Sequence, residues 1–274
     1  MKNKIGIIGF GNMGSAIAER IKTEYQVLVF DKDKNKTKRL KNIIVTDDVT
    51  TLVKRSDVLI LAVKPQDFVA VLGEIKHQVT DKLIISIAAG VGTKDIEAYL
   101  GRVRVIRVMP NLPAKVGAGM ICLSKGKYAR QNDLNFAKQL FIKLGKTLIL
   151  KKGKMDKVTA VSGSGPGFVY DQGKSLEEIK KKEHDFITSL TKSTIAIGFT
   201  YPEARELAET TTKGSILYLE KTKFSPAQAK KQVASKGGTT EAGLKVLHKG
   251  GSLTAAVKAA LKRARELARF VKVS

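Results

Sequence analysis

A glycine-rich turn near the N-terminus constrains the fold more than any other feature of the chain. The segment KIGIIGFGNMGSAIAERI (residues 4–21) reads as a short apolar strand, a turn and an amphipathic helix. Its glycines follow the spacing Gly9-x-Gly11-x-x-Gly14. In such a unit the first glycine permits a tight turn, the second lets the backbone approach a pyrophosphate, and the third packs the helix on the strand. The pattern predicts a dinucleotide-binding unit.

The residues after this turn support the prediction. A second apolar run, QVLVFD, ends at Asp31, where an acid would bind the adenosine ribose of the cofactor. Asp31 favours the free 2′-hydroxyl of NADH and would repel the 2′-phosphate of NADPH. The lysines at 32, 34 and 36 could offset this repulsion, so either NADPH or NADH is expected as the cofactor. A strand-to-helix turn without a ligand is the alternative. The predicted cofactor contacts here are Gly9, Phe10, Gly11, Asn12, Met13, Gly14, Asp31 and Lys32.

Alternating strand and helix patterns continue to about residue 150. DVLILAVKP (57–65), KLIISIAAGV (82–91) and RVIRVM (104–109) read as buried strands. Such alternation predicts a parallel doubly wound sheet that binds ligands beyond the carboxyl ends of its strands. AVKP and IAAG fall at such ends. We therefore expect an α/β fold with a dinucleotide-binding domain over residues 1–153.

The second half of the chain, residues 154–274, is expected to be all helical. VSGSGPGFV (161–169) reads as a small-residue turn before a helix. Ser175 with Glu178 forms a capping-box pattern that places a helix start near Leu176. Ser225 precedes a proline at a first helical position, and Ser252 is expected to cap the last helix.

Composition narrows the class of protein. The single cysteine, Cys122, allows no disulfide within the chain, which suits a reducing, cytoplasmic compartment. No apolar run approaches the ~18 residues of a membrane helix. The net charge of +25 raises the alternative of nucleic-acid binding, but the lysines are scattered and no zinc-finger or RNA-binding aromatic motif occurs. The three histidines show no metal-ligand spacing and are expected to be solvated, so no metal is predicted.

The segment VASKGGTTEAGLKVL (233–247) contains a turn of small, uncharged residues in a lysine-rich region. Gly237 and Gly238 would let a ligand approach the backbone, and the helix that follows would present free N–H groups to an anion. The alternative is that Thr239 or Thr240 only caps that helix.

Taken together, these motifs resemble the pyrroline-5-carboxylate reductase family. The glycine turn, AVKP, IAAG, RVMPNLPAKVGAGM, SGSGP and SKGGTTEAGLKVL stand in the family's order over almost the whole chain. The resemblance implies reduction of 1-pyrroline-5-carboxylate, a cyclic imine with a carboxylate, to L-proline by NADPH or NADH. It implies an all-α dimerisation domain at residues 154–274 and a homodimer that can build decamers. It also implies the following site residues: Ala62, Val63, Lys64, Pro65, Ile87, Ala88 and Ala89 beside the nicotinamide, and Gly237, Gly238, Thr239 and Thr240 around the substrate.

Within that resemblance, Thr240 is expected to orient the imine through its hydroxyl and is the candidate catalytic residue. Three departures from the family pattern stand out: Lys236 in the substrate loop, Val49 near the adenosine, and an insertion over residues 171–184. We expect the insertion to break the preceding helix and to be solvent-exposed outside the active site, with a subunit contact as the alternative. The alternative functions are another imine or 2-oxo/hydroxy-acid reductase of this architecture and a basic nucleic-acid-binding protein.

Overall fold

The computed structural model describes residues 3–270 and the side chains of residues 3–268. The chain forms two compact units. One contains Met1–Val108, Leu123–Lys143 and Ala268–Ser274, and we call it the nucleotide unit; the other contains Met109–Cys122 and Leu144–Leu267, and we call it the helical unit. The division into residues 1–153 and 154–274 stays a prediction.

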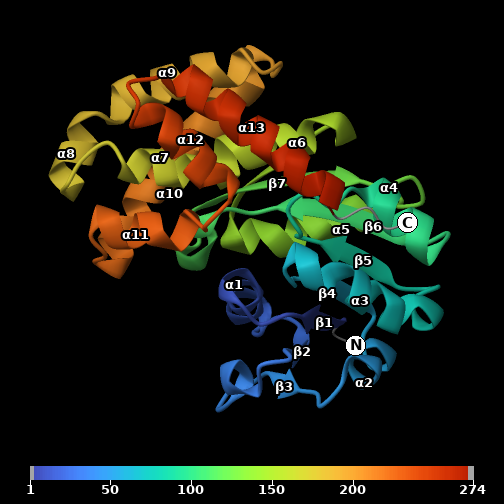
Figure 1. Ribbon diagram of the computed structural model, residues 1–274. Helices are drawn as coiled ribbons and strands as arrows, with labels where there is room; N and C mark the ends of the chain where they lie inside the picture. Colours follow the sequence, from blue (N-terminus) through green and yellow to red (C-terminus); the bar gives the residue numbers. More distant parts are fainter. Residues whose placement is uncertain (1–2, 271–274) are drawn as a thin grey trace. The chain divides into compact units, whose positions relative to one another are not determined.

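The elements follow one another as Figure 1 shows. The strands are β1 (Lys4–Ile8), β2 (Gln26–Phe30), β3 (Ile44–Val45), β4 (Val58–Leu61), β5 (Leu83–Ser86), β6 (Arg104–Met109), β7 (Gly119–Lys125) and β8 (Gly145–Ile149). The helices are α1 (Asn12–Ile21), α2 (Val49–Lys54), α3 (Pro65–Ile75), α4 (Thr93–Leu100), α5 (Gln131–Phe141), α6 (Met155–Val158), α7 (Gly165–Tyr170), α8 (Leu176–Lys181), α9 (Glu183–Ile195), α10 (Tyr201–Thr222), α11 (Pro226–Val233), α12 (Thr239–Leu247) and α13 (Leu253–Phe270).

The eight strands have the order β3-β2-β1-β4-β5-β6-β7-β8. The pairs from β3 to β6 are all parallel, with Ile5 of β1 opposite Val27 of β2 on one side and Val58 of β4 on the other. From β1 the chain adds β2 and β3 on one side and then returns to add β4, β5 and β6 on the other side. The switch point of the sheet therefore lies between β1 and β4. The predicted doubly wound sheet is confirmed.

The core strands of the nucleotide unit are apolar on both faces because helices cover a parallel sheet on both sides. Residues 58–61 and 83–86 are fully buried along their whole length. Phe68 and Leu72 of α3 and Leu52 of α2 pack against this sheet in a single apolar cluster. Helices α2 and α3 start at defined points, the first capped by the Asp48 carboxylate and the second with Pro65 at its first turn.

The helical unit is built around the long helix α10. Glu203 accepts hydrogen bonds from the backbone N–H and hydroxyl of Thr200 and so closes a capping box at the start of this helix. The rings of Tyr170 and Tyr218 lie 6.5 Å apart in the buried apolar cluster of the unit. The all-helical character predicted after residue 153 is confirmed, since no strand follows β8 in the described part of the chain.

The predicted helix starts are confirmed. Ser175, Ser225 and Ser252 each accept a hydrogen bond from a backbone N–H three residues later. The insertion breaks the helix as expected, because α7 ends at Tyr170 and α8 begins at Leu176. The helix predicted within VSGSGPGFV is confirmed as α7, which begins at Gly165. The small-residue turn before it differs from the prediction, because residues 159–163 form a π-helical turn that joins α6 to α7.

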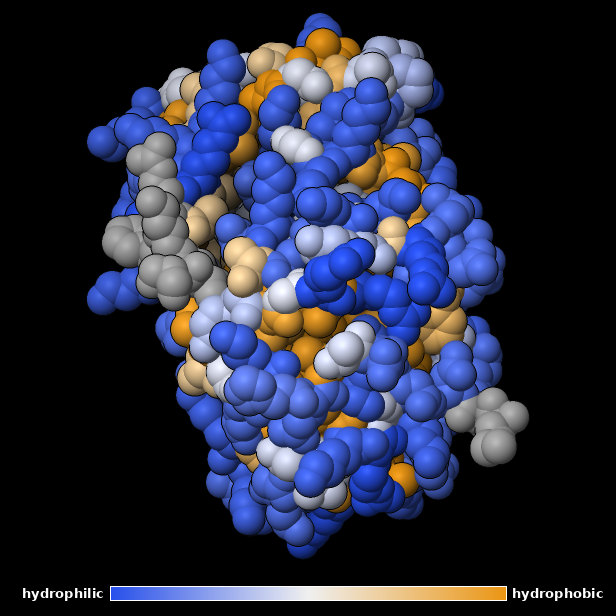
Figure 2. All heavy atoms as spheres, turned by 90° about the vertical axis from the view of Figure 1, so that its right-hand side faces the viewer, coloured by the Kyte–Doolittle hydropathy of each residue, from blue (hydrophilic) through white to orange (hydrophobic). Residues whose placement is uncertain are grey.

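The excess of lysine is spread over the surface. Figure 2 shows one face covered mainly by hydrophilic residues, with smaller groups of hydrophobic residues among them. Acidic side chains form ion pairs with some of the lysines, such as Glu206 with Lys146 and Glu220 with Lys180. None of the helices described between residues 3 and 270 combines the length and apolarity that crossing a membrane requires.

Candidate active site

The glycine turn in the nucleotide unit gives each glycine a different role. Gly9 has φ +100°, and a Cβ there would lie 2.7 Å from the carbonyl oxygen of Ala62. A Cβ on Gly14 would lie 2.0 Å from the carbonyl oxygen of Gly9, so helix α1 could not pack on the turn with a larger residue. A Cβ on Gly11 would meet nothing within 4 Å. The position that a side chain of residue 11 would occupy is therefore open space.

The start of helix α1 is free to bind an anion. Gly11 occupies the N-cap position, and no side chain caps the helix there. The first backbone N–H groups of α1 consequently lack an acceptor from the helix itself, and the helix dipole makes this end positive. Ser15 does not compete for these groups, because its hydroxyl donates to the Gly11 carbonyl oxygen at 2.8 Å.

Asp31 follows β2 and holds the glycine turn in place. Its Oδ2 accepts a hydrogen bond from the Phe10 backbone N–H at 2.7 Å, and its Oδ1 accepts one from the Asp33 N–H at 2.8 Å. Burial raises the pKa of the Asp31 carboxyl, but these two bonds and the Lys36 ammonium outweigh it, and the pKa lies below its ordinary value. Asp31 is thus ionised at neutral pH and faces the turn.

The lysines after Asp31 differ in their freedom to meet a 2′-phosphate. Lys36 donates to the Asp31 carboxylate at 3.2 Å, and Lys32 donates to Asp67 of α3 at 2.7 Å. Lys34 is exposed, and its ammonium group makes no hydrogen bond or ion pair with another described residue. The sequence did not predict the pairing of Lys32 with Asp67, because the two residues are 35 positions apart.

These residues surround a hollow of about 300 Å³ in the nucleotide unit. It is lined by Ile8, Gly9, Gly11, Phe30, Asp31, Lys32, Lys36, Ala62, Val63, Lys64, Gln66, Asp67 and Val71. Phe10, Asn12, Met13, Gly14 and Pro65 flank the hollow in sequence but do not line it, and neither do Ile87, Ala88 and Ala89. The Ile87 N–H donates to the Leu61 carbonyl oxygen at 3.1 Å, which places IAAG beside the end of β4.

Asp31 is expected to contribute to stability in a way that depends on pH. Its folded pKa lies below the unfolded value of about 3.9, so its contribution is fully present above that value and is lost as pH falls through the folded pKa. We expect Asp31→Asn to lower the free energy of unfolding by about 1–2 kcal/mol at pH 7. Urea unfolding without cofactor, from pH 7 to pH 3, should show the difference shrinking below about pH 4. A difference that stays constant to pH 3 would contradict this role.

The small-residue loop in the helical unit precedes helix α12. Gly237 has φ +70°, a conformation that side chains rarely adopt, and its N–H donates to the Glu241 carboxylate at 2.6 Å. The Gly238 N–H donates to the Ser235 carbonyl oxygen at 3.0 Å. A Cβ on Gly238 would lie 2.5 Å from the Ser235 hydroxyl oxygen and 3.0 Å from the Ser235 carbonyl oxygen, so a larger residue here would require the loop to shift. The conformation of the loop is thus set from within.

The threonines after this loop do not cap the helix. Gly238 is the N-cap residue of α12, and Thr239 and Thr240 are its first two residues, with no side chain capping the helix. The Thr239 hydroxyl oxygen accepts a hydrogen bond from the Ser164 hydroxyl at 2.9 Å. Thr240 is 3% exposed, and its hydroxyl makes no hydrogen bond to a described residue and is not sealed from solvent. The capping alternative is therefore wrong, and the Thr240 hydroxyl is available to a ligand.

Two charged groups hold the loop from outside. Arg263 of α13 donates from Nε to the Gly237 carbonyl oxygen at 2.7 Å, and its Nη1 pairs with Glu266 at 3.0 Å. The hydrogen bond from Gly237 is the largest influence on Glu241 and lowers the pKa of its carboxyl, so this group is ionised. Neither Arg263 nor Glu241 could be predicted from the sequence, because both lie on helices whose patterns show only an apolar face.

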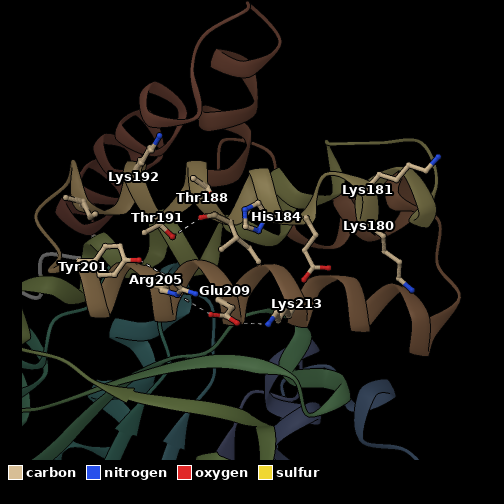
Figure 3. A pocket seen from close by; sticks show the side chains of 13 residues that line it. Lys180, Lys181, His184, Thr188, Thr191, Lys192, Tyr201, Arg205, Glu209 and Lys213 are labelled. Atoms are coloured by element: carbon tan, nitrogen blue, oxygen red, sulfur yellow. Dashed lines mark hydrogen bonds and ion pairs between the residues drawn. The ribbon is translucent and has the colours of Figure 1, made fainter.

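A larger hollow of about 580 Å³ lies between helices α9 and α10 of the helical unit (Figure 3). Its lining is mainly charged, and along α10 Arg205 donates to the Tyr201 hydroxyl and Lys213 pairs with Glu209. Four residues of the insertion line it: Lys180, Lys181, Glu183 and His184. None of the predicted cofactor or substrate residues does, so this hollow is distinct from the candidate active site.

The three histidines are exposed, as expected. His248, whose side chain is 59% exposed, also lies within 3.1 Å of both carboxylate oxygens of Asp171. This pairing joins residues 77 positions apart, which no local pattern reveals. Within residues 3–268, no group of three or more histidine, cysteine, aspartate or glutamate side chains is placed to hold a metal ion.

Two family models match separate parts of the chain. Residues 4–90 match the model described as NADP oxidoreductase coenzyme F420-dependent. Residues 184–269 match the model described as pyrroline-5-carboxylate reductase dimerisation. The two matches fall on the glycine turn with its sheet and on the segment that contains helices α9 to α12.

Relatives of known name match the chain over nearly its full length. Pyrroline-5-carboxylate reductase of Pisum sativum is 34% identical over 96% of this chain and 95% of its own. That of Methanosarcina acetivorans is 34% identical over 96% of this chain and 97% of its own. Among solved structures, Plasmodium falciparum pyrroline carboxylate reductase with NADP bound matches with a TM-score of 0.63 at 28% identity, covering 97% of this chain and 98% of that one.

Proposed function

The chain belongs to the pyrroline-5-carboxylate reductase family, and we propose that it reduces 1-pyrroline-5-carboxylate to L-proline with NADPH or NADH. The observation that carries the substrate assignment is the bare start of helix α12. There a helix without a side-chain cap presents free N–H groups beside a threonine hydroxyl that has no partner among the described residues. A small ring that bears a carboxylate and a polar nitrogen is complementary to such a site.

The nucleotide unit fits a dinucleotide. The open side of Gly11 and the uncapped start of α1 suit a pyrophosphate, because both remove side chains from the approach to the backbone N–H groups. The Asp31 carboxylate already accepts three hydrogen bonds, and its oxygens can accept a further one from a hydroxyl of the adenosine ribose. When bound, the cofactor supplies the hydride. Ala62, Val63 and Lys64 line the same hollow, and Ile87 follows the neighbouring strand, so these residues are proposed to orient the nicotinamide.

In the helical unit, the substrate carboxylate is proposed to lie at the start of α12. The Gly237 and Gly238 N–H groups are already bonded within the loop, so the N–H groups of Thr239 and Thr240 are the donors for the carboxylate. Gly237 and Gly238 have no side chains that would block the carboxylate as it approaches these N–H groups. Each such charge-assisted hydrogen bond is worth about 1.5–3 kcal/mol.

The Thr240 hydroxyl is proposed to accept a hydrogen bond from the protonated ring nitrogen. An iminium accepts hydride at its carbon without a metal or a strong acid, so the residues need only hold the ring, exclude water and orient the nitrogen. Thr240 is suited to this because packing restricts its side chain: a Cβ on Gly167 of α7 would lie only 2.3 Å from its methyl carbon. After hydride transfer the same oxygen accepts a hydrogen bond from the product amine.

Both cofactors are expected to support turnover. Asp31 favours a free 2′-hydroxyl, while the exposed Lys34 is available to a 2′-phosphate and Lys36 is already paired with Asp31. We expect kcat/KM with NADH to be within about tenfold of that with NADPH, a difference of no more than ~1.4 kcal/mol. Initial rates with each cofactor at saturating substrate measure this ratio. Turnover with NADPH and none with NADH would contradict this role of Asp31.

A substrate series separates the proposed activity from another reductase of the same architecture. We expect 1-pyrroline, which lacks the carboxylate, to be reduced with kcat/KM at least 100-fold lower than 1-pyrroline-5-carboxylate, equivalent to ~2.7 kcal/mol. An open-chain 2-oxo acid should give no NADPH oxidation, because it presents no cyclic imine nitrogen to Thr240. Equal rates with and without the carboxylate would contradict the substrate site at α12.

The match to the dimerisation model supports self-association of the helical unit. A homodimer, and decamers built from dimers, are part of the proposal, as is a cytoplasmic location. The dispersed lysines supply a positive field that attracts an anionic substrate and cofactor, which accounts for the charge without a nucleic-acid partner.

A further inference from the structure

Helix α7 presents one face to the elements around the substrate loop. Ser164, Gly167 and Asp171 are spaced three and four residues apart, so they lie on the same side of the helix. Ser164 donates to the Thr239 hydroxyl at 2.9 Å, and Gly167 leaves room for the Thr240 methyl group. The first two of these positions therefore contact the start of α12 directly.

The third position, Asp171, binds the helices on both sides of the loop. Its carboxylate accepts a hydrogen bond from Lys230 of α11 at 2.7 Å and lies 3.1 Å from Nε2 of His248, the residue directly after the C-terminal end of α12. The Asp171 side chain is 15% exposed. Burial raises the pKa of its carboxyl, but Lys230 and His248 outweigh this effect and hold the pKa below its ordinary value.

The connection between the two helices is short. Helix α11 ends at Val233 and α12 begins at Thr239, so residues 234–238 alone join them. A loop of this length has few conformations once the helices at its ends are fixed relative to each other. Asp171 contacts Lys230 in the last turn of α11 and His248 directly after α12, so it fixes the two helices that this loop joins relative to each other.

We propose that Asp171 is a positioning residue for substrate binding, which acts by fixing helices α11 and α12 and thereby the start of α12. This inference rests on the proposed function, because it assumes that the substrate carboxylate and ring nitrogen bind at Thr239 and Thr240. The Asp171 carboxylate makes its described polar contacts with Lys230 and His248, and none of them is with residues 234–238. Asp171 is the first residue of the insertion, so the insertion is joined at this point to the helices that carry the candidate substrate site.

The test compares steady-state kinetics of Asp171→Asn with those of a matched variant, Glu203→Gln. Asparagine keeps the shape of aspartate and removes the charge that binds Lys230 and His248. We expect the KM for 1-pyrroline-5-carboxylate to rise about 5-fold or more. The KM for NADPH should stay within twofold of wild type, because the proposed cofactor residues belong to the nucleotide unit. Asp171→Glu, which keeps the charge, should recover part of the loss.

Glu203 is a suitable control because it is also a partly buried carboxylate of the helical unit that binds a lysine, Lys154, and has a lowered pKa. It has no described contact with α11, α12 or the loop. We expect Glu203→Gln to lower Tm by an amount similar to Asp171→Asn, while the KM for 1-pyrroline-5-carboxylate stays within twofold of wild type.

Two outcomes would overturn the inference. If Asp171→Asn lowers Tm but leaves the substrate KM within twofold of wild type, Asp171 only stabilises the fold. If both Asp171→Asn and Glu203→Gln raise the substrate KM equally, the effect reflects general loosening of the helical unit. A wild-type protein that does not reduce 1-pyrroline-5-carboxylate would instead show that the proposed function fails, and this inference with it.

Discussion

Gly11→Ala is expected to weaken NADPH binding at least tenfold, equivalent to ~1.4 kcal/mol, while leaving the fold intact. Gly11 has an ordinary extended backbone with φ −78°, and a Cβ there would contact nothing within 4 Å. The chain itself therefore gives no reason for glycine at this position. The reason lies in the ligand, because a methyl group would stand where the pyrophosphate approaches the backbone. Fluorescence titration with NADPH and a thermal melt without cofactor measure the two effects separately.

Gly14→Ala is the matched comparison for this prediction. Its Cβ would lie 2.0 Å from the Gly9 carbonyl oxygen, so the turn and helix α1 would have to move apart. This variant should therefore lose both stability and cofactor binding. A Gly11→Ala protein that binds NADPH as tightly as wild type would show that the pyrophosphate does not approach this turn. A Gly11→Ala protein with a Tm lowered as much as that of Gly14→Ala would show that Gly11 serves the fold.

Thr240→Val is expected to lower kcat for reduction of 1-pyrroline-5-carboxylate at least tenfold with little change in Tm. Valine reproduces the shape of threonine, and the Thr240 hydroxyl forms no hydrogen bond to a described residue that the change would break. The loss should appear in kcat, because the hydroxyl orients the ring nitrogen during hydride transfer, at a cost of ~1.4 kcal/mol or more. Steady-state kinetics over a range of substrate concentrations measure this effect.

Thr194→Val supplies the control for this change. Thr194 is also buried in the helical unit, but its hydroxyl donates to the Leu190 carbonyl oxygen of its own helix at 2.7 Å. It should leave the kinetics unchanged. Equal kcat values for Thr240→Val and wild type would contradict the assigned role of Thr240. Gly238→Val is a poorer test, because its side chain would meet Ser235 within the loop and distort the site without a substrate present.

Features encoded by neighbouring residues could be predicted from the sequence. The glycine turn, the end of β2 at Asp31 and the helix starts at Ser175 and Ser225 each depend on residues within one or two turns of each other. Strand periodicity and burial likewise identified β4 and β5, because a strand between two helical layers must be apolar on both faces. The parallel sheet could be predicted from these local signals.

Contacts between distant residues could not be predicted in this way. Ser164 binds Thr239 across 75 positions, and Asp171 binds Lys230 across 59, and nothing in the spacing of either pair indicates an interaction. The π-helical turn at residues 159–163 was also missed, because small residues suit a loop as well as a widened helix. These features surround the start of α12, so the sequence predicts a site there but not the residues that hold it in place.

The central claim, hydride transfer to the imine carbon of 1-pyrroline-5-carboxylate, is tested most directly with NADPH that carries deuterium at both C4 positions. The purified protein and this cofactor should convert the substrate to L-proline with one deuterium at C5, the former imine carbon, in amounts equal to the NADPH oxidised. Mass spectrometry and proton NMR of the product measure both. Proline without deuterium, or NADPH oxidation without formation of proline, would contradict the assignment.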